Sequence, residues 1–126
     1  MSDRQTHYLA GLKLFGQDRH AEAVDEYHKA LALSPDWTEA MHALATALSK
    51  LERHDEAIEV VQRVIELEPE DAFAYTSLSI FLQRKGLIPE AEKAAAKARM
   101  ISWKEELKTN PNAPPPTPPG GMNVVQ

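Results

Sequence analysis

The most constraining feature of this sequence is a set of positions that recur every 34 residues. Alanine recurs at Ala23, Ala57 and Ala91, and a glutamate precedes each of these alanines. Further columns keep the same period: Leu14, Leu48 and Leu82; Leu33, Leu67 and Ile101; and the pair Pro35 and Pro69. Self-similarity at a fixed period of about 20–50 residues indicates an array of repeats, in which each unit packs mainly on its neighbours.

Within one period the apolar residues follow the spacing of two successive helices. In the second unit Met41, Leu44, Ala45 and Leu48 have helical spacing, and the polar residues 52–55 follow them as a turn. A second stripe then contains Ala57, Ile58, Val61, Val64, Ile65 and Leu67. Pro69 disfavours helix in the residue before it, so the second helix should end there. Each unit is therefore predicted to contain a helix, a tight turn, a second helix and a proline turn.

This pattern resembles the tetratricopeptide-repeat (TPR) family over roughly residues 4–105. The resemblance depends on small and leucine residues in the first helix, small residues in the second helix, and the closing prolines. These residues are Ala10, Gly11, Leu14, Leu44, Ala45, Leu48, Leu78, Ser79 and Leu82; Ala23, Tyr27, Ala30, Ala57, Val61, Val64 and Ala91; and Pro35 and Pro69. The resemblance implies an all-α fold. We expect a right-handed α-solenoid of three helix pairs, at about residues 4–37, 38–71 and 72–105.

Two departures from the family pattern affect the expected structure. His7 and Met41 replace the large aromatic residue near the start of the first helix, and Tyr75 alone matches it. Trp103 replaces the closing proline of the third unit, so we expect the last helix to continue through Leu107. A polar outer face with Glu92, Lys93, Lys97 and Arg99 suits an extended C-terminal capping helix, on which no further repeat stacks.

The composition changes abruptly after Asn110. Residues 111–119 contain six of the nine prolines, and Gly120 and Gly121 follow them. We therefore divide the chain into a three-repeat domain at residues 1–110 and a flexible Pro/Gly-rich tail at 111–126, which should be polyproline II or disordered and unpacked. Three roles of the tail stay open: a solvated end, a ligand for SH3- or WW-like grooves, and a tether for residues 122–126.

The residue types exclude most chemistry. The chain has no cysteine, its five histidines lack metal-site spacing, and Gly11 and Gly16 are not followed by the lysine of a phosphate loop. No catalytic triad or desolvated carboxylate pair is recognisable. We therefore expect no enzymatic activity, cofactor or metal. The net charge of −5 disfavours nucleic-acid binding, and the absence of a long apolar run disfavours membrane insertion. The N-terminus lacks a signal segment, which makes the cytoplasm the expected location.

The resemblance also implies a binding surface. In TPR arrays the first helices line a concave groove, where peptides usually bind. Mapped onto this chain, the predicted groove residues are Gln5, Tyr8, Leu12 and Phe15; Glu39, His42, Ala43, Thr46 and Ser49; and Phe73, Thr76, Ser77, Ile80 and Gln83. Family members that act with heat-shock proteins grip a terminal carboxylate with Lys, Asn and Arg side chains. This chain has Tyr8, Leu12, Ala43, Phe73 and Ser77 at those places, so an apolar or amphipathic segment is the expected ligand.

Three functions remain open at this point. The preferred one is a protein–protein interaction scaffold or adaptor that binds a peptide or helix of a partner. The second is a self-assembling unit, because residues 38–71 carry nine acidic and three basic side chains whereas residues 72–105 carry three acidic and six basic. Pairing of these surfaces would produce a homo-oligomer. The third is a regulator or domain fragment whose activity lies in another chain.

Overall fold

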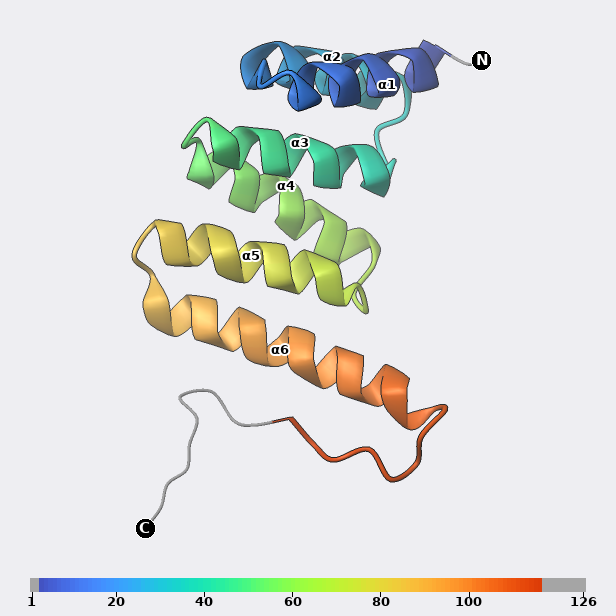
Figure 1. Ribbon diagram of the computed structural model, residues 1–126, viewed down its shortest axis with the longest axis vertical. Coiled ribbons are helices and arrows are strands. Elements are labelled where there is room, and N and C mark those ends of the chain that lie inside the picture. The colour runs from blue at the N-terminus through green and yellow to red at the C-terminus, as the bar shows by residue number, and fades with distance from the viewer. Residues whose placement is uncertain (1–2, 117–126) are drawn as a thin grey trace.

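The computed structural model describes residues 3–116, and these form six helices arranged as three stacked pairs (Figure 1). The first pair is α1 (Asp3–Gly16) and α2 (His20–Leu33), the second is α3 (Thr38–Lys50) and α4 (His54–Leu67), and the third is α5 (Ala72–Arg84) and α6 (Ile88–Leu107). Each helix packs mainly on the helices before and after it in the chain, with a smaller contact between α1 and α3. The expected all-α solenoid is confirmed, as is the continuation of the last helix through Leu107.

The turn inside each helix pair repeats with the same backbone geometry. Asp18, Glu52 and Gly86 have φ values of 62°, 63° and 84°, in the left-handed region. In each unit the next backbone N–H donates to a leucine carbonyl of the preceding helix, as from Arg53 to Leu48 at 2.9 Å. The turn is thus shorter than predicted, because residues 54 and 55 already belong to α4.

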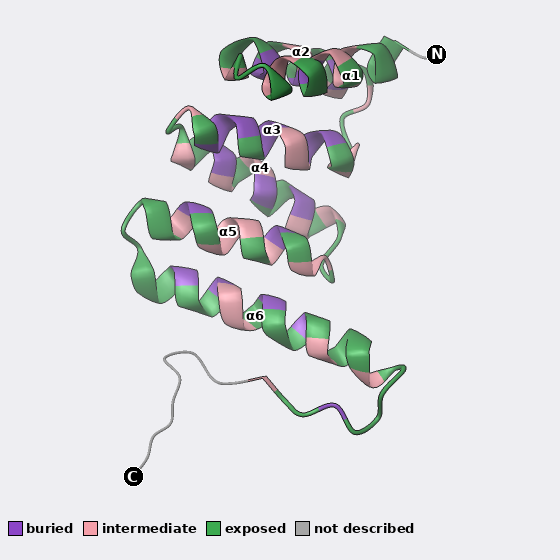
Figure 2. Ribbon diagram, viewed as in Figure 1, coloured by how far each residue is buried: buried purple, intermediate pink, exposed green. Residues whose placement is uncertain are grey.

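The core lies between the helices and is most continuous in the middle pair (Figure 2). The largest side chains with less than 2% exposure are Tyr27, Leu44, Leu48, Val61 and Val64. Alanine at the recurring column is buried in all three pairs, and Ala23 and Ala57 are fully inaccessible. Small residues at these positions let the backbones of neighbouring helices approach closely, which explains why the sequence keeps alanine there.

The prediction that the proline-rich segment stays unpacked is wrong for its first part. The main chain turns back after α6, with Ala113 N–H donating to the Asn110 carbonyl at 3.0 Å. Trp103 Nε1 donates to the Ala113 carbonyl at 3.0 Å, and Ala113 is only 6% exposed. The aromatic residue that replaces the third closing proline therefore holds this segment against α6. Residues 117–126 lie outside the described residues, and the division of the chain at residue 110 stays a prediction.

The inaccessible alanine in α4 gives a test of the helix packing. Replacing Ala57 with leucine should lower the free energy of unfolding by about 2 kcal/mol, because the added carbons have no space to occupy. Urea unfolding followed by circular dichroism measures the effect. Ala32→Leu is the matched control, because Ala32 is exposed on α2. Equal stability of Ala57→Leu and the wild type would contradict the packing described here.

Candidate protein-binding groove

The surface carried by α1, α3 and α5, which we call the groove face, has an apolar hollow between its first two helices. Leu12 and Phe15 of α1 and Ala43 and Thr46 of α3 line this hollow, and Tyr27 of α2 forms its floor. The volume is about 180 Å³. Leu12 is 41% exposed, so its side chain is available to a ligand. The structure therefore brings together residues that the sequence placed on one groove, and adds Tyr27 beneath them.

An aromatic cluster borders this hollow. The Tyr8 ring lies 4.8 Å from the Trp37 ring and 6.1 Å from the Tyr27 ring, measured between centroids. The Arg4 guanidinium stacks 4.7 Å above the Trp37 ring, and Trp37 Nε1 donates to Glu39 at 3.2 Å. Burial, with a smaller contribution from the Glu39 charge, raises the pKa of Tyr8. Tyr8 therefore stabilises the contact between the first two repeats and is not a free anchor.

Two of the predicted groove residues also belong to the packed interior. Tyr8 and Phe15 are half-buried and pack against the core. Phe15 also contacts the His20 ring, with centroids 4.7 Å apart. Removing either aromatic side chain would therefore disturb folding as well as binding.

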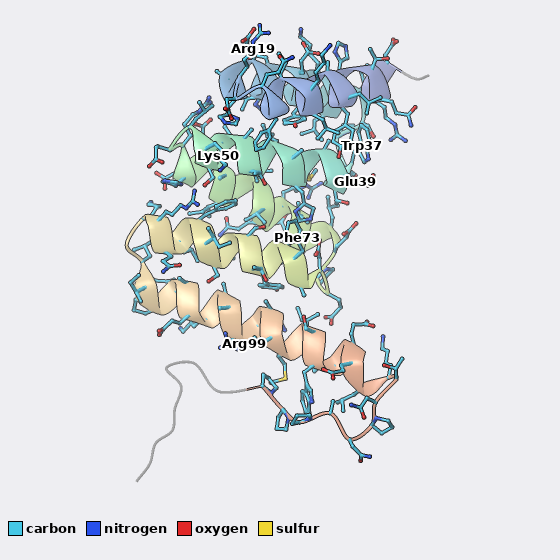
Figure 3. The ribbon with its side chains drawn as sticks, viewed as in Figure 1. Arg19, Trp37, Glu39, Lys50, Phe73 and Arg99 are labelled. Carbon is cyan, nitrogen blue, oxygen red and sulfur yellow. The ribbon has the colours of Figure 1, made fainter. Side chains whose placement is uncertain are left out.

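The middle of the groove face holds a polar link between the second and third repeats. His42 Nε2 lies 2.9 Å from Asp71 Oδ2, and the other oxygen of this carboxylate accepts from the Ala74 N–H at 3.2 Å. Asp71 thus caps α5 and fixes it to α3. The Phe73 ring lies 4.9 Å from the His42 ring and remains 60% exposed (Figure 3). Phe73 is an exposed aromatic side chain on a rigid helix, which suits an anchor for a ligand.

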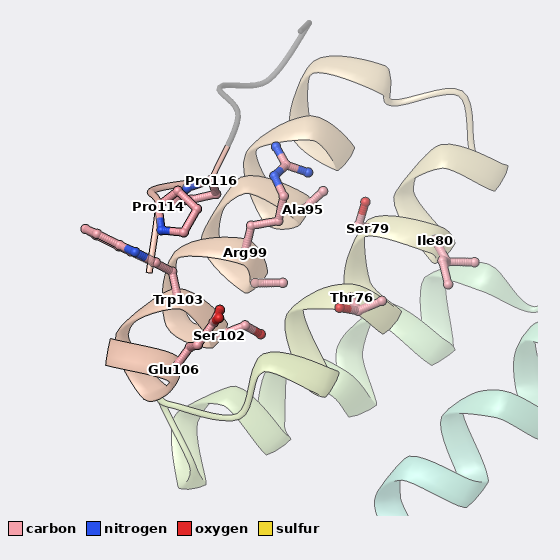
Figure 4. A pocket seen from close by; sticks show the side chains of 11 residues that line it. Thr76, Ser79, Ile80, Ala95, Arg99, Ser102, Trp103, Glu106, Pro114 and Pro116 are labelled. Carbon is pink, nitrogen blue, oxygen red and sulfur yellow. The ribbon is translucent and has the colours of Figure 1, made fainter. Parts of the chain in front are cut away.

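A larger hollow lies at the C-terminal end of the groove face. Thr76, Ser79 and Ile80 of α5 form one wall, α6 forms the other, and the segment after α6 reaches its edge (Figure 4). Its volume is about 450 Å³. Ile80 is 42% exposed. Two of the predicted groove residues, Thr76 and Ile80, therefore belong to this second hollow.

The remaining predicted residues differ in accessibility. Gln5, Glu39 and Gln83 are exposed, and Ser77 is half-buried. Ser49 is 3% exposed and accepts from Arg84 at 3.0 Å, so it links α3 to α5 and is not available to a ligand. Sequence reasoning did not place Trp37 beside the groove residue Tyr8, nor Trp103 at the hollow between α5 and α6. The sequence does contain a signal for both: Trp103 occupies the position where Pro35 and Pro69 recur, and Trp37 follows Pro35 by two residues.

Other kinds of site find little support in the described part of the chain. Residues 3–116 contain no group of three or more His, Asp or Glu side chains arranged to hold a metal ion. Among the same residues no helix is long and apolar enough to cross a membrane.

Helix pairs stacked in register, with first helices that form one shared face, define an α-solenoid of short helical repeats. Comparison with known families identifies which one: a family model described as tetratricopeptide repeat matches residues 14–79. The chain belongs to the tetratricopeptide-repeat family.

Individual relatives agree with this assignment. DnaJ homolog subfamily C member 3 of Rattus norvegicus is 28% identical over 111 residues, which cover 88% of this chain and 20% of the relative. The crystal structure of MamA superposes with a TM-score of 0.79 at 29% identity, covering 82% of this chain and 61% of MamA. The first TPR of Spaghetti (RPAP3), bound to the HSP90 peptide SRMEEVD, gives 0.72 at 21% identity, covering 88% and 82%. The chain thus spans less than two thirds of the first two relatives.

Proposed function

We propose that this protein is a non-enzymatic interaction scaffold that binds a short apolar or amphipathic segment of a partner protein on its groove face. The observation that carries the proposal is the set of exposed apolar side chains on the first helices: Leu12 on α1 and Phe73 and Ile80 on α5. Exposed apolar groups grouped around hollows usually mark protein-binding surfaces. Membership of a family that generally serves protein interaction supports the same function.

The residue types on the groove face favour an apolar ligand over a charged terminus. Spaghetti binds the HSP90 peptide SRMEEVD, which ends in a carboxylate and carries three acidic residues. Where the resemblance places the carboxylate-gripping side chains, this chain has Tyr8, Leu12, Ala43, Phe73 and Ser77, none of them cationic. We therefore expect the SRMEEVD peptide not to bind, and it serves as the negative control below.

Removal of two anchors tests the proposal. Peptides are first selected from a random displayed library on the intact protein, and an enriched peptide is then titrated by fluorescence anisotropy. Leu12→Ala combined with Phe73→Ala should weaken its binding by about 2 kcal/mol, or about thirtyfold, because truncated anchors lose most of the contact energy. The helical circular-dichroism signal should not change, since both side chains are largely exposed.

Two controls make that experiment decisive. Leu33→Ala removes a side chain that is 57% exposed but lies on α2, away from the groove face, and should leave the affinity unchanged. Truncation after Asn110 tests whether residues 122–126 compete for the groove, in which case the truncated chain binds the peptide more tightly. Equal affinity of the double variant and the wild type would rule out Leu12 and Phe73 as anchors.

Self-assembly is the alternative function, and the ion pairs weaken its motivation. Three acidic side chains of the second repeat already have partners: Glu56 with Arg53, Glu66 with Arg63, and Asp55 with Lys85. The acidic surface is thus partly neutralised within the chain. Sedimentation at low and high salt tests the idea, because association through charged surfaces should weaken as salt screens them. A monomer at high concentration and low salt would exclude it.

Location and non-protein partners stay predictions. We expect the protein in the cytoplasm and free of nucleic acid, and cell fractionation and a titration with DNA and RNA test these two points. The chain covers only 20% of the rat relative. A role as a regulator or fragment whose activity lies in another chain therefore stays a separate hypothesis.

A further inference from the structure

The outer side of the last helix pair, which we call the end face, is the place that the next helix would fill in a longer array. Within the array, α3 packs on α2 with a smaller contact to α1, and α5 packs on α4 (Figure 1). Tyr27 and Val61 are therefore 1% and 0% exposed. Their equivalent in α6 is Ala95, at the same spacing of 34, and it is only half-buried. The end face thus continues an interface that the fold has already built twice.

The end face is hollow around Ala95, where the inner helices have the larger residues Tyr27 and Val61. The hollow of about 450 Å³ includes Ala95, Ala98 and Ser102 on its wall. A second hollow of about 150 Å³ adjoins it and shares Ser79 and Ala95. Together they follow the α5–α6 seam. This length of unfilled seam suits a helix better than a single side chain.

Among residues 3–116, the segment after α6 covers one edge of this face. Pro114 and Pro116 line the larger hollow beside Trp103, whose indole N–H holds the Ala113 carbonyl (Figure 4). Neither proline lines the second hollow. Residues 110–116 therefore act as a partial cover, which a tighter ligand has to displace at that edge.

The charge of Arg99 determines which kind of helix suits the end face. Leu31 of α2 shares a hollow with Met41 and Leu44 of α3, so these positions lie close together at the inner interface. The residue equivalent to Leu31 on the end face is Arg99, which is exposed and makes no ion pair within residues 3–116. A helix that stacks here as α3 does would bring its Met41-equivalent side chain towards Arg99. An acidic residue at that place would pair with the guanidinium.

A second copy of this chain is a poor match for the same face. Its α1 would be the stacking helix, and it carries His7 where α3 has Met41. His7 already lies 2.8 Å from Glu26 within its own chain, and its side chain offers no carboxylate to Arg99. Lys13 stands where α3 has the inaccessible Ala47, so stacking of copies would bury an amine.

We propose that the end face binds an amphipathic helix of a partner protein that presents small or apolar side chains to the α5–α6 seam and an acidic side chain to Arg99. This site adjoins the groove face at Ile80, and it is separate from the hollow between α1 and α3. The scaffold thus has two binding surfaces, and the end face extends the solenoid by one helix supplied in trans.

The α3 sequence itself provides the probe. Two peptides of residues 38–50 are titrated into the isotope-labelled full chain, one unmodified and one with M41E, and the two tryptophan indole N–H signals are followed by NMR. We expect the Trp103 signal to move and the Trp37 signal, on the groove face, to stay. The M41E peptide should bind about fivefold more tightly than the unmodified peptide, the effect of one partly exposed ion pair.

Variants of the protein assign the site. Arg99→Glu should abolish the advantage of the M41E peptide, whereas Lys97→Glu, an exposed change on the same helix, should preserve it. Truncation after Asn110 should tighten binding of both peptides, because it removes the partial cover. Circular dichroism shows that each variant keeps its helices.

Four results would overturn the proposal. The first is movement of the Trp37 signal instead of Trp103, which would assign the peptide to the groove face. The second is an M41E advantage that is absent or survives Arg99→Glu. The third is a Trp103 shift caused by deleting residues 117–126 alone, which would make the chain's own end the occupant. The fourth is a Trp103 shift with protein concentration in the absence of peptide, which would indicate a second copy.

Discussion

Replacing Gly11 with alanine should lower the free energy of unfolding by about 3 kcal/mol, even though alanine is the better helix former. Gly11 is buried in α1. A Cβ atom at this position would lie 2.4 Å from Tyr27 Cε1 and 2.6 Å from Tyr27 Cδ1. These carbons belong to a side chain that is 1% exposed and packed in the core, so the ring has no free space into which to move. The steric cost therefore outweighs the gain in helix propensity.

Gly16 provides a control with the opposite sign. It is the last residue of the same helix, and a Cβ there would meet no atom within 4 Å. Gly16→Ala should leave stability unchanged or raise it by about 0.5 kcal/mol, because the unfolded chain loses freedom. Urea unfolding of both variants measures the difference. If Gly11→Ala were as stable as Gly16→Ala, the close approach of α1 to Tyr27 would be wrong.

The second large effect is a loss of stability in alkali that depends on Tyr27. Burial, and to a lesser extent the neighbouring Tyr8, raises the pKa of Tyr27 from 10.0 to about 12. The folded state therefore favours the neutral phenol. The stabilisation is complete below pH 10 and is lost as pH rises through about 12, because the unfolded chain releases the proton first. A shift of this size corresponds to a total of about 3 kcal/mol.

Comparison with Tyr27→Phe isolates this contribution from the other groups that titrate in alkali. Between about pH 9 and 11.5 the wild type should lose about 2 kcal/mol more stability than the variant. Urea midpoints at the two pH values, converted with the measured slopes, give this difference. Equal losses in both proteins would mean that the Tyr27 hydroxyl is well hydrated in the folded state.

The spacing of residues in the sequence predicted part of the groove. Mapping the first helices onto the family pattern predicted Leu12, Phe15, Ala43 and Thr46 on one surface, and the structure brings these four around one hollow. The same mapping predicted Tyr8 on the groove, but its ring packs on Trp37 and Tyr27. Trp37 lies in the loop between α2 and α3. The apolar periodicity of the helices therefore gives no information on where the Trp37 ring packs.

The sequence predicted the turn inside each repeat but not its left-handed backbone conformation. Only the third unit has glycine at the left-handed position; aspartate tolerates it at Asp18, but Glu52 carries no signal for a positive φ. The surrounding helices impose that conformation, because the next backbone N–H has to reach a leucine carbonyl of the preceding helix. Packing of the pair thus overrides the local preference of an acidic residue.

The sequence by itself determined the number of helix pairs, their approximate bounds and the family, because the 34-residue period repeats the same local pattern of small, apolar and turn residues. Only the tertiary structure decided which side chains remain accessible. Ser49 is buried against α5, Phe73 stays exposed beside His42, and Ala113 packs under Trp103. Such contacts join residues of different helices, or of a helix and a loop, and their distances depend on how the pairs stack. A pattern along one helix defines its faces, whereas the stacking of its neighbours determines which face meets solvent.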